Sequence, residues 1–216
     1  MEKIEQLIKG NKEFQNLHFK KFEFEFDELV EKGQSPEILF IGCSDSRVVP
    51  DLITGSRPGD LFIMRNIGNF VPPFKKDNDY HGTAAAIEYA VSVLGVAHII
   101  VCGHSHCGAC ESLYKVLPEG DDLVHVRKWL ELGTITKNFV EQNFEGYEFS
   151  EKLRITEQIS VIFQLENLLT YPAVKRKVEE GILTIHGWYY ELQSGSIKYF
   201  DSDTLEFKEL AHQSER

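Results

Sequence analysis

Two short stretches of the sequence, about sixty residues apart, carry side chains that could bind a metal and act on a substrate. Cys43, Asp45 and Arg47 lie together after one apolar run, and His104 and Cys107 lie together after another. Two thiolates and an imidazole form a soft ligand set that suits zinc, and three protein ligands leave one coordination position for water. These residue types could therefore form a zinc site with one open position.

Two buried strands are expected to position these side chains. Residues 38–41 and 96–102 are short apolar runs rich in β-branched residues, which is typical of strands covered on both faces. Gly42 precedes Cys43 and Gly108 follows Cys107, and a glycine beside each sulfur would let the backbone turn tightly there. Because ligands in α/β proteins bind beyond the carboxyl ends of parallel strands, we expect both clusters to meet at one edge of a sheet.

The rest of the chain alternates predicted helices and strands, as in an α/β domain. Further strands are expected at 61–64, 182–190 and 197–200, and helices at 50–54, 81–94, 107–117, over most of 121–170, and from 172 onward. Residues 193–196 predict a hairpin with a two-residue Ser-Gly or Gly-Ser loop. We expect a single domain over residues 1–216, with a mainly parallel central sheet flanked by helices and an antiparallel C-terminal edge.

Residues 1–33 are expected to form a helical N-terminal arm. Ile4, Leu7 and Ile8 repeat at helical spacing, and a second apolar set from Phe22 to Val30 does so again before Gly33. Residues 22–26 also alternate like a strand, but the glutamates and the apolar continuation favour a helix. The apolar face of this arm must pack on something, either on its own sheet or on another molecule.

Composition indicates a globular protein with an acidic surface. The chain has 216 residues, of which 42% are hydrophobic and 26% charged, and its formal net charge is −11. This charge argues against unassisted binding to nucleic acid or to an anionic membrane. No segment reaches the roughly 18 apolar residues that span a bilayer, and the first twenty residues do not resemble a signal peptide. A cytoplasmic location is therefore expected.

Cysteine usage is consistent with ligands rather than disulfides. The four cysteines occupy positions 43, 102, 107 and 110, a spacing that does not suggest a stapled secreted protein. Cys102 ends an apolar run and is expected to pack as a small hydrophobic residue. Cys107 and Cys110 form a C-x-x-C pair, so a redox dithiol is a rival interpretation of that segment.

The combination of motifs resembles the β-class carbonic anhydrases. C-x-D-x-R at 43–47 and H-x-x-C at 104–107 carry this resemblance, which extends from about Gln34 to Tyr190 through residues 59–66, 86–90 and 186–188. The resemblance implies that one Zn²⁺ per chain is held by Cys43, His104 and Cys107. It also implies the α/β fold of that family.

For activity, the resemblance implies reversible hydration of carbon dioxide to bicarbonate and a proton by zinc-bound hydroxide. Arg47 would hold the Asp45 carboxylate away from the metal, and Asp45 would accept a hydrogen bond from the hydroxide. The proton relay is left open between three candidates, Tyr80, His81 and His106. Rival functions are a hydrolase of the same fold acting on carbonyl sulfide or carbon disulfide, and a non-catalytic bicarbonate-binding module.

The resemblance also implies a shared site. Phe62, Ile67 and Tyr89 would line an apolar pocket for carbon dioxide, and Gln34 would supply an amide donor across a dimer interface. The N-terminal arm would lie over a neighbouring subunit, so a homodimer or a larger even homo-oligomer is expected.

Two expectations concern regulation and pH. Some family members bind bicarbonate in a second pocket that contains a tryptophan, an arginine and a tyrosine. Arg65 and Tyr190 match, but Phe40 stands at the tryptophan position and has no indole N–H, so the chain resembles the always-open members. Two thiolates also cancel the charge of Zn²⁺, so the pKa of its water should exceed the ~7 of a three-histidine site, and mildly alkaline pH should favour activity.

Overall fold

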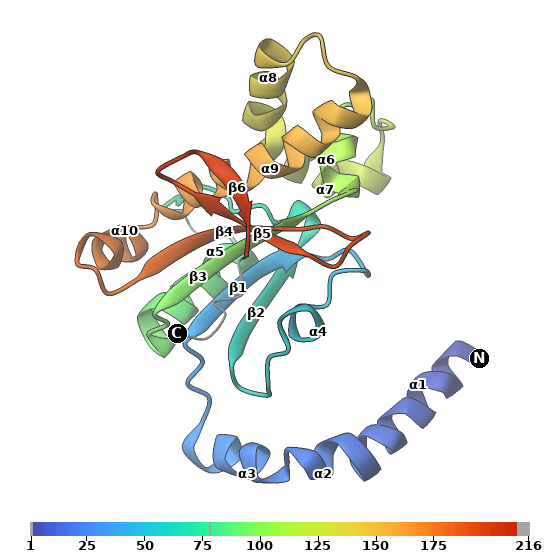
Figure 1. The fold of residues 1–216 in the computed structure, drawn as a ribbon, viewed down its shortest axis with the longest axis vertical. Helices are drawn as coiled ribbons and strands as arrows, with labels where there is room; N and C mark the ends of the chain where they lie inside the picture. The colour runs from blue at the N-terminus through green and yellow to red at the C-terminus, as the bar shows by residue number, and fades with distance from the viewer. Residues whose placement is uncertain (1, 78, 211–216) are drawn as a thin grey trace.

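The computed structural model describes residues 2–77 and 79–210, and its core is one six-stranded sheet in the order β2-β1-β3-β4-β5-β6 (Figure 1). The first four strands in this order pair in parallel, and the last two are antiparallel additions. This arrangement confirms the predicted fold class. The strands are β1 (Ile38–Cys43), β2 (Leu61–Asn66), β3 (His98–His104), β4 (Thr184–Tyr190), β5 (Ile197–Asp201) and β6 (Glu206–Glu209).

Helices cover the sheet unequally. Alternate residues of β1 and β3, such as Leu39 and Ile99, pack with residues of α5, α9 and α10, whereas Phe40 and Ile100 face the other side, where α4 contributes Ile53. Residues 39–41 of β1 and 99–102 of β3 are apolar because both faces of these strands are covered. The helical elements are α1 (Glu2–Glu13), η1 (Phe14–His18), α2 (Phe19–Lys21), α3 (Glu23–Lys32), α4 (Pro50–Thr54), η2 (Ile67–Asn69), α5 (Gly82–Glu88), η3 (Tyr89–Leu94), α6 (Gly108–Ser112), η4 (Asp121–Leu123), α7 (Val124–Leu130), η5 (Glu131–Gly133), α8 (Thr134–Asn143), α9 (Phe149–Leu168) and α10 (Pro172–Glu179).

The register between β1 and β3 sets the position of the candidate site. The two strands pair in parallel from Ile38 opposite His98 to Gly42 opposite Cys102, so their carboxyl ends emerge side by side. Cys102 is fully buried in this pairing, as expected of a packing residue. Within the described ranges, no helix has the length and apolar character needed to cross a bilayer.

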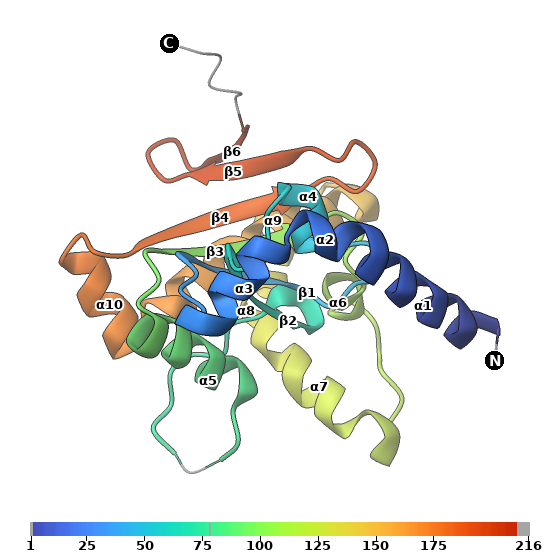
Figure 2. The same ribbon diagram turned by 90° about the horizontal axis from the view of Figure 1, so that it is seen from below.

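The N-terminal arm is helical, as predicted, and it projects from the sheet (Figures 1 and 2). Helix α3 ends at Lys32, and Gly33 follows with a positive φ of 80°. No residue of α1 or α3 is buried. Leu7 and Val30 are 70% and 84% exposed. In the single chain, the apolar face of α1 therefore does not cover its own sheet.

The hairpin between β4 and β5 differs from the prediction of a two-residue loop. Pairing runs to Tyr190 opposite Ile197, and Glu191 N–H donates to the Ser196 carbonyl, so the loop is longer. The Leu192 N–H instead donates to the Ser105 side chain at 2.9 Å, which draws the loop toward the end of β3. A tertiary contact therefore overrides the local turn signal.

The end of one helix was mispredicted, and one strand was missed. The helix expected over 107–117 ends at Ser112, because the following N–H groups bond three residues back rather than four, beginning with Leu113 to the Cys110 carbonyl. Pro118 cannot extend the segment because it has no N–H. The short edge strand β6 was not predicted, and it pairs with β5 through residues such as Phe207 opposite Phe200.

Close packing of α9 on β3 gives a first prediction. A Cβ atom at Gly103 would lie 2.6 Å from a methyl group of Val161 and 3.4 Å from the Glu157 carbonyl. We expect Gly103→Ala to lower the free energy of unfolding by about 1–3 kcal/mol, as overpacking does, in urea denaturation. Gly82→Ala is the control, since nothing lies within 4 Å of its Cβ position. Equal stability of the two variants would contradict this account.

Candidate metal centre

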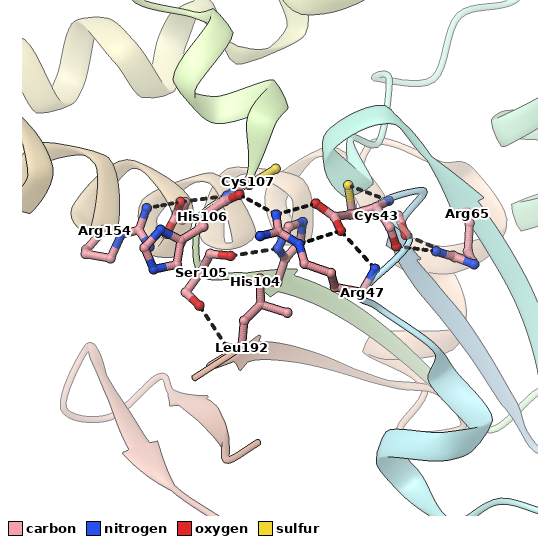
Figure 3. Close-up of polar contacts among 11 residues, drawn as sticks. Cys43, Arg47, Arg65, His104, Ser105, His106, Cys107, Arg154 and Leu192 are labelled. Atoms are coloured by element: carbon pink, nitrogen blue, oxygen red, sulfur yellow. Dashed lines mark hydrogen bonds and ion pairs between the residues drawn. The ribbon is translucent and has the colours of Figure 1, made fainter. Parts of the chain in front are cut away.

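Cys43, His104 and Cys107 converge where β1 and β3 end (Figure 3). Cys43 is the last residue of β1, His104 is the last residue of β3, and Cys107 is the N-cap of α6. One ligand atom from each residue can be chosen so that all three lie within 4.8 Å of one another, and all three residues are buried. The structure thus brings the three predicted ligands into one cluster.

The His104 ring is prepared to bind a cation through one nitrogen. Its Nδ1 lies 2.9 Å from the Ser105 carbonyl. Because a carbonyl can only accept, Nδ1 carries the proton and donates it, which leaves a lone pair on Nε2. This Nε2 is buried and has no hydrogen-bond partner. A buried acceptor without a partner is costly, and a metal ion would satisfy it.

The two sulfurs also fit a dication. The adjacent Cys107 side chain, followed by burial, raises the pKa of Cys43 to about 12, and the Cys110 side chain is the first cause that raises the pKa of Cys107. Without a cation, both groups stay protonated near neutral pH. A bound metal reverses this preference and deprotonates coordinating thiols. The donor set therefore fits Zn²⁺, with one position left for water.

Asp45 and Arg47 form a two-pronged ion pair beside this cluster. Arg47 donates from Nε to Oδ1 at 2.9 Å and from Nη2 to Oδ2 at 2.7 Å, and its backbone N–H also donates to Oδ1. These contacts, the side-chain bonds first, hold the pKa of Asp45 well below its usual range. Arg47 Nη2 also donates to the His106 carbonyl at 3.0 Å, which ties the pair to the Cys107 loop.

Arg65 fixes the backbone on either side of Ser44. Its Nε donates to the Cys43 carbonyl at 2.9 Å and its Nη2 donates to the Asp45 carbonyl at 2.6 Å. Phe40 is fully buried, and Tyr190 packs against the apolar cluster around it. Two of the N–H groups of Arg65, on Nε and Nη2, are therefore engaged by backbone carbonyls of the loop that carries Cys43 and Asp45.

The predicted pocket residues divide into two places. Ile67 follows Asn66, which pairs with Cys43, so it lies at the metal edge of the sheet. Phe62 pairs with Leu39, four residues before Cys43. At ~3.3 Å per residue this places Phe62 about 13 Å back along the strands.

Tyr89 lies beside Phe62, and Gln34 precedes β1, so neither is placed with the metal ligands. The Phe62 and Tyr89 rings are 5.8 Å apart, and Tyr89 is 44% exposed. Gln34 is exposed in the segment before β1, at the opposite end of that strand from Cys43. A single chain therefore does not bring these three residues to its own metal cluster.

The three proton-relay candidates differ in position. His106 directly precedes Cys107 and is exposed, with a left-handed φ of 58°. Tyr80 and His81 lie in the loop before α5, where His81 bonds to Asp77 at 2.7 Å. His106 is thus the candidate next to a metal ligand in the sequence, and no spacing in the sequence selects among the three.

A buried polar network under Cys107 was missed by the sequence analysis. Glu157 of α9 is 2% exposed and accepts the Cys107 backbone N–H at 2.9 Å. Its carboxylate also accepts from Arg154 and from the Tyr189 hydroxyl, each at 2.7 Å. Burial is the main cause that raises the pKa of Glu157 to about 7. One glutamate in a helical pattern, fifty positions after Cys107, gave no signal of this role.

Comparison with known proteins is consistent with this geometry. Residues 38–197 match the family described as carbonic anhydrase. The carbonic anhydrase of Synechococcus elongatus is 42% identical over 194 residues, covering 90% of this chain and 70% of that protein. That of Helicobacter pylori strain J99 is 35% identical over 204 residues, covering 93% and 92%.

Solved structures agree in fold. The β-carbonic anhydrase CcaA superposes with a TM-score of 0.89 at 39% identity, covering 95% of this chain and 98% of that one. A tetrameric β-carbonic anhydrase of Sordaria macrospora superposes with a TM-score of 0.81 at 30% identity, covering 92% and 97%.

The cluster predicts which cysteines are needed for metal. We expect Cys107→Ser to lose zinc, because a serine hydroxyl does not replace a thiolate ligand, whereas Cys110→Ser should keep about one zinc per chain. Elemental analysis of the purified variants measures this. Full zinc occupancy in Cys107→Ser would contradict the ligand assignment, and zinc loss in Cys110→Ser would indicate a different ligand set.

Proposed function

The chain belongs to the β-carbonic anhydrase family, and we propose that it catalyses the zinc-dependent, reversible hydration of carbon dioxide to bicarbonate and a proton. The single observation that carries this proposal is the buried cluster of Cys43, His104 and Cys107, with its unpartnered His104 Nε2, next to a carboxylate held by Arg47. Zn²⁺, when bound by these three residues, would supply a Lewis acid that lowers the pKa of water and makes it a stronger nucleophile.

Asp45 is proposed to orient the attacking water. Its depressed pKa keeps it ionised, and Oδ1 accepts two hydrogen bonds from Arg47 while Oδ2 accepts one. A carboxylate oxygen has two lone pairs, so Oδ2 keeps one that can accept a proton donor of the substrate water. Arg47 fixes the carboxylate by a bidentate contact and thereby prevents it from acting as a fourth metal ligand.

The always-open form is proposed for this chain. The Asp45–Arg47 pair is intact, Arg65 is bonded to two backbone carbonyls, and Phe40 has no donor for a second anion. These features together favour a carboxylate that stays on Arg47.

A cytoplasmic location remains a prediction from the sequence.

A shared active site is proposed because Gln34, Phe62 and Tyr89 lie away from the metal cluster of their own chain. In a two-fold dimer, the same residues of the second chain can complete the pocket beside Ile67. A groove of about 680 Å³ between α3 and the sheet, with Ile100 and Trp188 in its lining, offers space for part of that chain. A tetrameric relative of the same fold supports assembly in even numbers.

The catalytic proposal predicts different failures for Asp45→Asn and Arg47→Ala. Asp45→Asn should retain zinc but lose most hydration activity, because the amide supplies neither the charge nor both acceptor oxygens. Arg47→Ala should let the pKa of Asp45 rise toward ~3.9 and free the carboxylate to bind the metal.

Stopped-flow carbon dioxide hydration, zinc analysis and a crystal structure of Arg47→Ala test this pair of variants. A normally active Arg47→Ala with Asp45 unmoved would refute the positioning role. Wild-type protein that binds zinc but does not hydrate carbon dioxide would refute the function itself. Carbonyl sulfide and carbon disulfide in the same substrate panel test the rival hydrolase.

Subunit complementation tests the shared site. Cys107→Ser removes the metal half, and Gln34→Ala with Tyr89→Ala removes the pocket half. When the two inactive proteins are refolded together, heterodimers contain one intact site, so roughly a quarter of wild-type activity should return by random pairing of isologous subunits. No recovery despite heterodimer formation, or a fully active monomer in sedimentation, would contradict the shared site.

A further inference from the structure

Glu157 is a buried acid of α9 that the proposed chemistry does not use. We propose that it is a positioning residue, whose carboxylate holds the Cys107 backbone so that the Cys107 sulfur is set in place for zinc. This inference rests on the proposed zinc function of the cluster and concerns the affinity for the metal.

The contacts of Glu157 reach three separate segments. Oε1 accepts the Cys107 N–H at 2.9 Å and Arg154 Nη2 at 2.7 Å, and Oε2 accepts the Tyr189 hydroxyl at 2.7 Å. Cys107 lies between β3 and α6, Arg154 is one turn earlier on α9, and Tyr189 is on β4. One buried carboxylate thus joins the metal-binding loop to a helix and to the sheet.

Other hydrogen bonds hold the residues beside the Cys107 N–H: Ser105 N–H donates to the Tyr190 carbonyl, and the His106 carbonyl accepts from Arg47. The preceding His106 has a left-handed φ of 58°, and Cys107 itself is an extended N-cap with φ −73° and ψ 115° and no side-chain cap. The Cys107 N–H points toward α9, where the Glu157 carboxylate is its partner. Without that acceptor, the N–H would be buried and unpaired unless the loop moved, and the sulfur would move with it.

The helix that carries Glu157 is fixed firmly over β3. The Cβ position of Gly103 lies 2.6 Å from Val161 and 3.4 Å from the Glu157 backbone carbonyl, so helix and strand are in direct contact. Tyr189 is fully buried and pairs with Gly103 in the β3–β4 ladder. Glu157 is therefore held in a fixed position by α9 and Tyr189, and its hydrogen bond fixes the Cys107 backbone relative to the sheet.

Backbone groups around the three cysteine and histidine side chains have partners of opposite kinds: two carbonyls accept from arginines, and one N–H donates to a carboxylate (Figure 3). The Cys43 carbonyl accepts from Arg65, and the His106 carbonyl accepts from Arg47. The Cys107 N–H needs an acceptor rather than a donor, and an acidic side chain on α9 provides it. Groups that orient metal ligands in this way commonly contribute a factor of about 10–100 to metal affinity.

Zinc affinity, measured by competition with a chromophoric chelator on the full-length protein, tests the proposal. Glu157→Ala should bind zinc about 10- to 100-fold more weakly than wild type. Gln164→Ala is the matched control: Gln164 is also buried on α9 and accepts a backbone N–H, that of Val71, at 2.8 Å. It should lower stability in urea but leave zinc affinity within about threefold.

A conservative variant keeps the test decisive if Glu157→Ala does not fold. Glu157→Gln retains an oxygen for the Cys107 N–H and can direct its amide toward the Tyr189 oxygen. Its zinc affinity should therefore stay within about tenfold of wild type, closer than that of Glu157→Ala. In the Co²⁺-loaded proteins, the sulfur-to-cobalt absorption band should shift for Glu157→Ala and remain in place for Gln164→Ala.

The outcomes separate this inference from the function on which it rests. Wild-type protein that binds no zinc would refute the metal centre. Wild-type and Glu157→Ala proteins that bind zinc equally tightly, or an equal loss in Gln164→Ala, would refute only the positioning role of Glu157. If Glu157→Ala does not fold, a loss of more than about tenfold in Glu157→Gln would also refute it, because that variant retains the acceptor for Cys107.

Discussion

The parallel pairing of β1 with β3 is the constraint on which the rest of the centre depends. Their ladder places Gly42 opposite Cys102, so that Cys43 and His104 emerge together at the carboxyl edge. A slip of one residue would turn every side chain of a strand to the other face of the sheet. Because both faces of β1 are apolar, it is the fit of the side chains that opposes such a slip: Leu39 and Phe40 are fully buried in two different close-packed clusters, and a slip would exchange them. Packing of the core thus determines the geometry of the ligands.

Burial makes the centre unfavourable for its own ligands in the absence of a cation. Two adjacent sulfurs have raised pKa values, and the His104 Nε2 has no partner. A bound dication removes both problems at once, so metal binding and local folding are expected to be coupled. Unlike these groups, the two neighbouring acids have partners in the chain: Asp45 forms an ion pair with Arg47, and Glu157 forms one with Arg154. The site therefore has paired charges around a core whose three donor atoms fit a cation.

The sequence predicted the parts of the fold that depend on local pattern. The buried strands, the helical arm ending before Gly33 and the antiparallel edge are present because periodicity and chain breaks specify them. The Leu192 loop and the end of α6 were mispredicted, since the Ser105 contact and the tightened turns depend on the tertiary structure. In the site, the two motifs and the family that they resemble indicated Cys43, His104 and Cys107, and the structure brings these residues together. Glu157 could not be found, because its role arises only when α9 crosses β3.

The length of the strands explains why one chain does not complete the proposed pocket. Cys43 and Gln34 lie at opposite ends of β1, and Phe62 with Tyr89 lies about 13 Å behind the metal edge at ~3.3 Å per residue. Under the proposed assembly, a second chain related by a two-fold axis would present the same residues from outside. The same proposal accounts for the exposed apolar face of α1, which would pack on the neighbouring chain. On the proposed function, assembly is therefore part of the active site, since the chain that binds the metal is not the chain that completes its pocket.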